Sequence, residues 1–119
     1  MIFQHDNFGG EMVQADKTRL AFDATECMAA YWITRGPDTT KIRTIRSTLF
    51  DRPGQRSDGR KAWYLLSPDS ILSPMSVGLA AYASAGEAQA AQRKRGGRLL
   101  RWNQVVAFVR DKWQLPPKR

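Results

Sequence analysis

Residues 19–30 read RLAFDATECMAA, and this stretch decides the first half of the fold. Residues 19–22 alternate polar and apolar side chains, which is typical of a half-buried strand. Residues 23–26 then have the spacing of a capping box, in which the Asp23 carboxylate accepts from a free amide and Glu26 reaches back to the cap. The pattern therefore predicts a strand that leads into a helix through Cys27, which stops before Gly36-Pro37.

Two further strands are expected on either side of this stretch. Residues 11–14 alternate in the same way, and the polar pair Asp16-Lys17 can form the turn between them and residues 19–22. Residues 41–50, which are rich in Ile and Thr, follow as a strand candidate. The first half of the chain is thus expected to be a hairpin, a helix and a strand.

A similar pattern recurs 61 residues later, where Ser84 and Glu87 take the places of Asp23 and Glu26. Strands are expected at residues 62–66 and 75–83, and the helix should end at Gly96-Gly97. A strand at 99–102 and a last helix capped by Asn103 complete the half. The apolar side of that helix would carry Val105, Val106, Phe108, Val109 and Trp113.

These elements predict an α+β protein with two related ββαβ-like halves. The halves cover approximately residues 1–52 and 60–113, and together they form one small domain over residues 1–119. Residues 51–60 are expected to be the linker, because they contain Pro-Gly and Asp-Gly pairs and lack large apolar side chains. With 42% apolar residues in 119, the chain has enough material for a core.

Several functional classes are excluded by the sequence. It contains no run of eighteen apolar residues that could cross a membrane, and its first residues lack the pattern of a secretory signal. It also lacks a catalytic triad, a P-loop and a dinucleotide fingerprint. We therefore do not expect an enzyme. The single cysteine, Cys27, cannot form an internal disulfide or build a structural zinc site by itself.

The net charge of +8 is unevenly distributed. Acidic and basic residues cancel over residues 1–59, whereas residues 93–119 carry nine Lys or Arg against Asp111 alone. Such a segment is either a solvated surface or a site for an acidic partner. Nucleic acid is not the expected partner, because a stacking platform needs aromatic residues interleaved with the basic ones, and only Trp102 and Trp113 meet that requirement.

Soft donor atoms are the other chemical feature of the sequence. Thiolate and thioether ligands select Cu(I) over hard cations. Cys27 should lie in the first turn of a helix, where free amides and the helix dipole favour a thiolate. Met75 follows Pro74 at an irregular strand start, where a side chain can be presented at a rim. The candidate ligands are Met75, Cys27, Met28, Met1 and His5. The alternative for Cys27 and the methionines is ordinary core packing, and for His5 an exposed side chain.

Several segments resemble the NosL family of nitrous oxide reductase accessory proteins. They are Phe8-Gly9-Gly10-Glu11-Met12-Val13, residues 20–28 (LAFDATECM), residues 73–82 (SPMSVGLAAY) and residues 96–102 (GGRLLRW). Their order and spacing agree with that family over roughly residues 1–109. The family's Pro-Met methionine falls on Met75, and the cysteine of its Asp-x-x-x-Cys segment falls on Cys27. Its N-terminal Cys-x-x-Cys-x-Met motif would end at Met1, so neither of that motif's cysteines lies within this sequence.

The resemblance implies a small α+β protein that binds Cu(I) and supports assembly of the copper centres of nitrous oxide reductase or another copper-accepting protein. It also implies a periplasmic or membrane-anchored location if a lipoprotein signal precedes Met1. The leading hypothesis is thus a copper(I) chaperone-like accessory protein. The alternative is a basic interaction module that binds nucleic acid or an acidic protein through residues 93–119.

Overall fold

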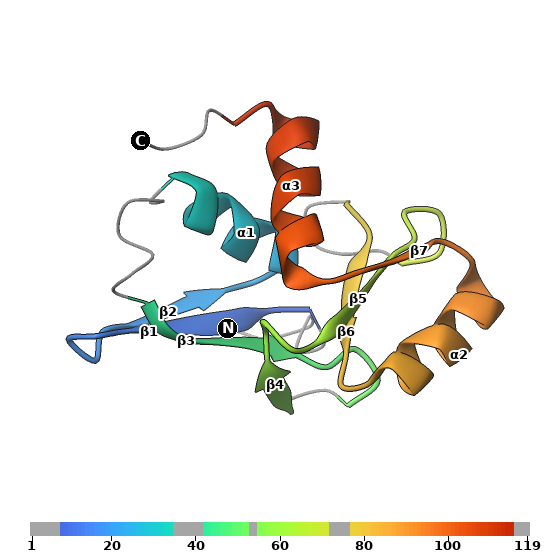
Figure 1. The fold of residues 1–119 in the computed structure, drawn as a ribbon, viewed down its shortest axis with the longest axis horizontal. Helices are drawn as coiled ribbons and strands as arrows, with labels where there is room; N and C mark the ends of the chain where they lie inside the picture. The colour runs from blue at the N-terminus through green and yellow to red at the C-terminus, as the bar shows by residue number, and fades with distance from the viewer. Residues whose placement is uncertain (1–7, 35–41, 53–54, 72–76, 116–119) are drawn as a thin grey trace.

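The computed structural model describes residues 8–34, 42–52, 55–71 and 77–115. Figure 1 shows their arrangement as two small sheets with three helices. The elements in chain order are β1 (Gly10–Gln14), β2 (Arg19–Phe22), α1 (Thr25–Thr34), β3 (Ile42–Thr48), β4 (Arg56–Asp58), β5 (Trp63–Leu66), β6 (Leu79–Tyr82), α2 (Ala85–Arg95), β7 (Arg98–Leu100) and α3 (Trp102–Trp113). The predicted α+β class is confirmed.

The first sheet has the order β2-β1-β3-β4, and all its neighbouring strands are antiparallel. The predicted hairpin is confirmed, with Gly10 opposite Phe22 and Val13 opposite Arg19. Lys17, which lies between β1 and β2, has a φ of 72°, in the left-handed region of backbone conformation. Helix α1 follows the hairpin directly and begins at Thr25, one residue after the start that a cap at Asp23 implies.

The linker prediction for residues 51–60 is wrong in part, because β4 lies within it. Arg56, Ser57 and Asp58 pair with Thr48, Ser47 and Arg46 of β3. None of the three β4 residues is apolar, so their own sequence carries no strand pattern. The strand forms because the backbone of β3 offers an open edge with which it can pair.

The second sheet has the order β6-β5-β7, again antiparallel throughout. This order matches β2-β1-β3 in the first sheet, because in each half the strand after the helix pairs with the first strand of the hairpin. The predicted ββαβ pattern of both halves therefore agrees with the observed topology. The helix cap at Ser84 is also confirmed, since Ser84 Oγ accepts from the Glu87 amide at 3.2 Å.

Several boundaries in the second half differ from the prediction. Strand β6 covers Leu79–Tyr82, whereas a strand was expected over residues 75–83. Strand β7 covers Arg98–Leu100 rather than residues 99–102, and α3 begins at Trp102. Its N-cap is Arg101 and not Asn103, because the Gln104 side chain accepts from the Arg101 amide at 2.9 Å. Trp102 enters the helix because its ring is buried in the core, with 3% of its surface exposed.

The two halves share a core. One buried cluster joins Met12 and Met28 of the first half to Tyr64, Leu79 and Val105 of the second. Helices α1 and α3 pack against each other beside the sheets, whereas α2 covers the second sheet at the far end of the molecule (Figure 1). A bridge between Leu49 and Ala81 and an ion pair between Arg52 and Glu87 connect the halves further.

Candidate metal centre

Cys27 lies in the first turn of α1 and is half-buried. Its neighbours in the chain, Glu26 and Met28, are both fully buried, with 0% of their surface exposed. The thiol therefore belongs to the side of the helix that turns away from the core, and a soft metal ion could reach it from the surface.

The surroundings of the Cys27 thiol favour its protonated form. Partial burial raises its pKa above the ordinary value, and the negative charges of Glu26 and Asp23 raise it further. The expectation that the helix N-terminus would favour a thiolate is therefore wrong in this respect. The two carboxylates beside the thiol oppose the effect of the helix dipole. Any metal bound here has to displace a proton.

Met28 points into the protein core. Its side chain is fully buried in the cluster with Met12 and Ile45. A Cβ built on Gly10 would lie 3.1 Å from both the Met28 sulfur and its methyl carbon, so the absence of a side chain at Gly10 makes room for Met28. The sulfur is held in a packed position, as is usual for a methionine that fills a core.

Three candidate ligands, Met1, His5 and Met75, lie outside the described residues. Two residues near them in the chain, Phe8 and Ile71, are among those that the structure describes. Phe8 and Ile71 belong to the same buried cluster, with 6% and 1% of their surface exposed. The Thr25 hydroxyl, in the first turn of α1, donates to the Phe8 carbonyl at 3.4 Å. Phe8 therefore lies next to the helix turn that carries Cys27, and Ile71 shares a buried cluster with Phe8.

Arg95, at the end of α2, contacts Ser70, which precedes Ile71, and also Phe50, which packs on Phe8. Its Nη1 donates to the Ser70 carbonyl at 3.2 Å and to the Ser70 hydroxyl at 3.1 Å. The same guanidinium lies 5.1 Å from the centre of the Phe50 ring, and Phe50 packs on Phe8 with 5.4 Å between the ring centres. One side chain thus supports both residue 70 and, through Phe50, residue 8.

The sequence did not predict these contacts of Phe8, Ile71 or Arg95. Their role depends on contacts between segments far apart in the chain, such as Arg95 with Ser70. The only local signal was the basic end of α2, where Arg93, Lys94 and Arg95 complement the helix dipole. This basic pattern does not indicate that Arg95, and not Arg93 or Lys94, contacts Ser70.

Within the described ranges, no group of three or more His, Cys, Asp or Glu side chains is arranged to hold a metal ion. Over the same ranges, no helix is long and apolar enough to cross a membrane. Cu(I) prefers the sulfur donors of methionine and cysteine to carboxylate ligands.

Comparison with known proteins agrees with the predicted family. A search of curated proteins finds no match. The crystal structure of the copper chaperone NosL from Shewanella denitrificans has the same fold, with a TM-score of 0.69 and 13% sequence identity over 81% of this chain and 76% of that chain. At this identity the likeness establishes the fold alone. The family model of NosL, however, matches residues 1–109, and the chain therefore belongs to the NosL family.

Proposed function

We propose that this protein is a Cu(I)-binding accessory protein that carries copper to another protein. Membership of the NosL family supports the proposal, as does the shared fold with a structure described as a copper chaperone. The observation that carries it within this chain is the partly exposed Cys27 thiol in the first turn of α1, a turn whose Thr25 hydroxyl donates to the Phe8 carbonyl. A soft donor at this surface position could share an ion with methionine sulfurs from other segments.

The proposed donors are close in the sequence to described residues. Met75 lies two residues before Val77 and four after Ile71, and His5 lies three residues before Phe8. We propose Met75 and Cys27 as the principal ligands, with Met1 or His5 completing a shell of low coordination number.

The copper ion is cargo in this proposal, so the protein's task is reversible coordination. A half-exposed thiol such as that of Cys27 suits ligand exchange, because an incoming donor from a partner can reach the metal. We propose nitrous oxide reductase or another copper-accepting protein as the recipient. We further propose that the exchange takes place in the periplasm, as the family resemblance implies.

We expect the chain to bind one Cu(I) ion in preference to Zn(II). Thioether and thiol donors favour the soft monovalent ion, whereas Zn(II) is usually held by four ligands drawn from thiolate, imidazole and carboxylate groups. Titration with each metal in competition with a chromogenic chelator measures this preference. Tighter binding of Zn(II) than of Cu(I) would contradict the proposed function.

Copper affinity should also depend on pH in a defined direction. The pKa of the Cys27 thiol is raised above its ordinary value, so the thiol is protonated near neutral pH and must release its proton when it binds the metal. The apparent association constant should therefore fall about tenfold for each unit that the pH is lowered between about pH 8.5 and 7, a range above the usual titration of histidine.

The Cys27→Ser variant is the control for this measurement. Thioether ligands carry no proton, so a site made of methionines alone should bind copper equally well across the same range. If wild type and Cys27→Ser give the same flat pH profile, Cys27 is not a ligand.

A further inference from the structure

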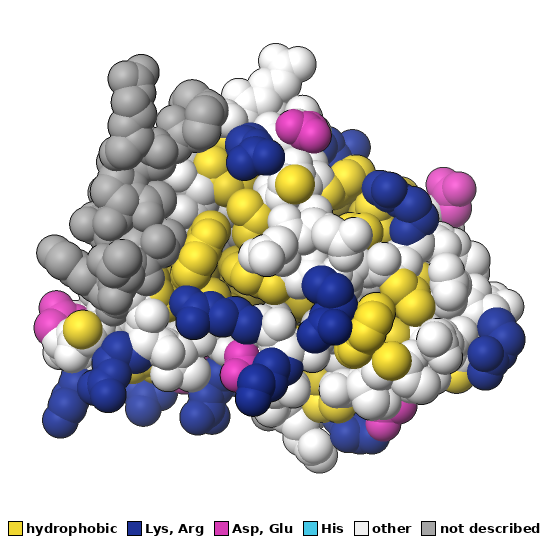
Figure 2. Space-filling model, in the orientation of Figure 1, with side chains coloured by type: hydrophobic (Ala, Val, Ile, Leu, Met, Phe, Trp, Pro, Cys, Tyr) yellow, Lys and Arg dark blue, Asp and Glu magenta, His cyan; other side chains and the backbone are white. Residues whose placement is uncertain are grey.

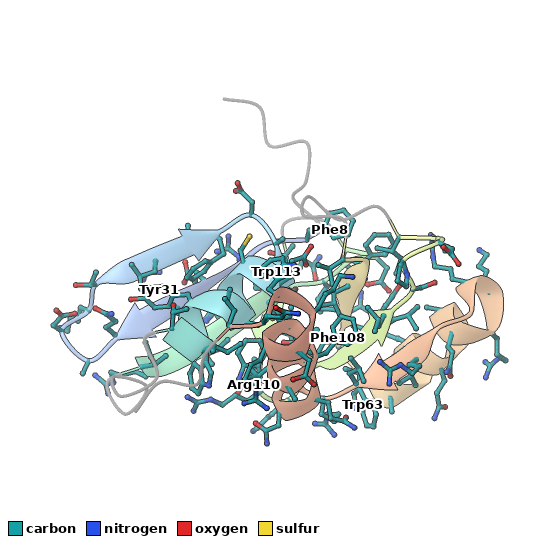
Figure 3. All side chains as sticks on the ribbon, turned by 90° about the horizontal axis from the view of Figure 1, so that it is seen from above. Phe8, Tyr31, Trp63, Phe108, Arg110 and Trp113 are labelled. Carbon is teal, nitrogen blue, oxygen red and sulfur yellow. The ribbon has the colours of Figure 1, made fainter. Side chains whose placement is uncertain are left out.

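Around β7 and the start of β5, three arginine side chains lie over aromatic rings of α1, β5 and α3. Figure 2 shows Lys and Arg side chains interspersed with hydrophobic ones across one face of the molecule, and Figure 3 shows Trp63 at the edge of the molecule beside the start of α3. We call the following group the arginine face: Arg60, Lys61, Arg98 and Arg101, with the rings of Trp32, Trp63 and Phe108.

The fold brings these residues together from three parts of the chain. The guanidinium carbon of Arg101 lies 4.3 Å from the centre of the Trp63 ring, and its Nη2 donates to the Lys61 carbonyl at 3.3 Å. Arg98, at the other end of β7, lies 5.8 Å from the Phe108 ring centre. Arg60 lies 5.3 Å from the centre of Trp32. Each arginine is therefore held against a ring instead of moving freely in solvent.

These cations also lack acidic partners in the part of the chain that the structure describes. The ion pairs there join Arg19 and Arg56 to Glu11, and Arg52 to Glu87. The nearby Asp58 carboxylate accepts from the backbone amide of Arg60 at 3.0 Å. Arg60, Lys61 and Arg98 are exposed, and Arg101 is half-buried. The arginine face thus presents fixed donors whose charge is not neutralised locally.

We propose that the arginine face is the docking site for an acidic segment of a partner protein. Planar guanidinium groups bind carboxylates through two parallel hydrogen bonds, and arginine and tryptophan are the residues that contribute most at protein interfaces. The surface is defined by its own contacts. Only the identification of the partner as the copper recipient rests on the proposed function.

Other anionic partners fit the arrangement less well. Binding of single-stranded nucleic acid uses aromatic rings on which bases stack, but here the arginines lie over Trp63 and Phe108. Insertion into a membrane interface needs protruding apolar side chains, and both of these rings are half-buried. What the face offers is an array of hydrogen-bond donors, which suits carboxylate groups.

The test measures binding of a labelled peptide of alternating Glu and Gly to the full chain at physiological salt. The double variant Arg98→Gln/Arg101→Gln should weaken binding about tenfold, because two charge-assisted contacts are lost. The matched control Lys17→Gln/Arg43→Gln removes the same charge from exposed positions near the turn of the β1–β2 hairpin and should change binding less than about twofold, as expected for charges distant from the contact. Arg101→Lys keeps the charge but loses the planar group, and should weaken binding about threefold.

The outcomes separate the alternatives. An equal loss in the Lys17→Gln/Arg43→Gln control would show attraction by net charge alone and overturn the proposal. Tighter binding to a DNA duplex or to phosphatidylglycerol vesicles than to the acidic peptide would also overturn it. Thermal melts identify variants that fail to fold, in which case Arg101→Lys and the single variant Arg98→Gln provide the test. Copper affinity should be unchanged in all these variants, so a failure of docking and a failure of copper binding can be told apart.

Discussion

Replacement of Met28 by alanine should lower the free energy of unfolding by about 2–5 kcal/mol, the usual cost of removing a large side chain from a packed core. Met28 is fully buried against Met12 and the backbone of Gly10, so little of the cavity can collapse. Urea denaturation followed by circular dichroism measures the loss.

The Met28→Leu variant separates packing from metal binding. Leucine keeps the volume and removes the sulfur, so it should restore most of the lost stability, within about 1.5 kcal/mol of wild type. We expect this variant to bind Cu(I) as wild type does, because the sulfur lies in the core cluster. A stable Met28→Leu protein with weakened copper binding would show instead that Met28 is a ligand.

Replacement of Met75 by alanine should weaken Cu(I) binding by about tenfold or more, since even indirect disturbance of a metal's ligand shell usually costs 10–100-fold. Cys27→Ser should have an effect of similar size at pH 8, where displacement of the thiol proton is easiest. Both substitutions should leave the melting temperature nearly unchanged. A side chain that serves the metal rather than the core contributes little to folding in its absence.

Much of the fold could be predicted because its signals are local. The alternation in residues 19–22, the cap at Ser84 and the stop at Gly96 each depend on side chains a few positions apart, and the structure has β2, α2 and its end at these places. The recurrence between the halves was also visible in the helix starts. It corresponds to the same strand order in both sheets.

Elements that depend on distant partners could not be predicted in this way. Strand β4 has only polar residues and forms by pairing with β3. The start of α3 depends on burial of the Trp102 ring, which packs edge-on against Trp32 with 5.9 Å between the ring centres. Neither contact leaves a periodic pattern in the sequence.

The candidate site also combines features that follow from the local sequence with features that depend on tertiary contacts. The sequence placed Cys27 in the first turn of a helix, and this is where it lies. Its protonation could not be predicted from the helix alone, because burial has the largest effect on the thiol pKa and depends on tertiary packing. The support that Arg95 gives to Ser70 and Phe50 is likewise a tertiary contact.

The most direct test of the copper proposal is a Cu(I) competition titration on wild type, Met75→Ala and Cys27→Ser, with thermal melts run in parallel. If Met75 and Cys27 are ligands, wild type should retain copper against a chelator concentration that removes it from both variants, while all three proteins melt at similar temperatures. If the three proteins lose copper to the chelator equally and Met75→Ala melts at a lower temperature, Met75 is a core residue and the proposed copper site is wrong.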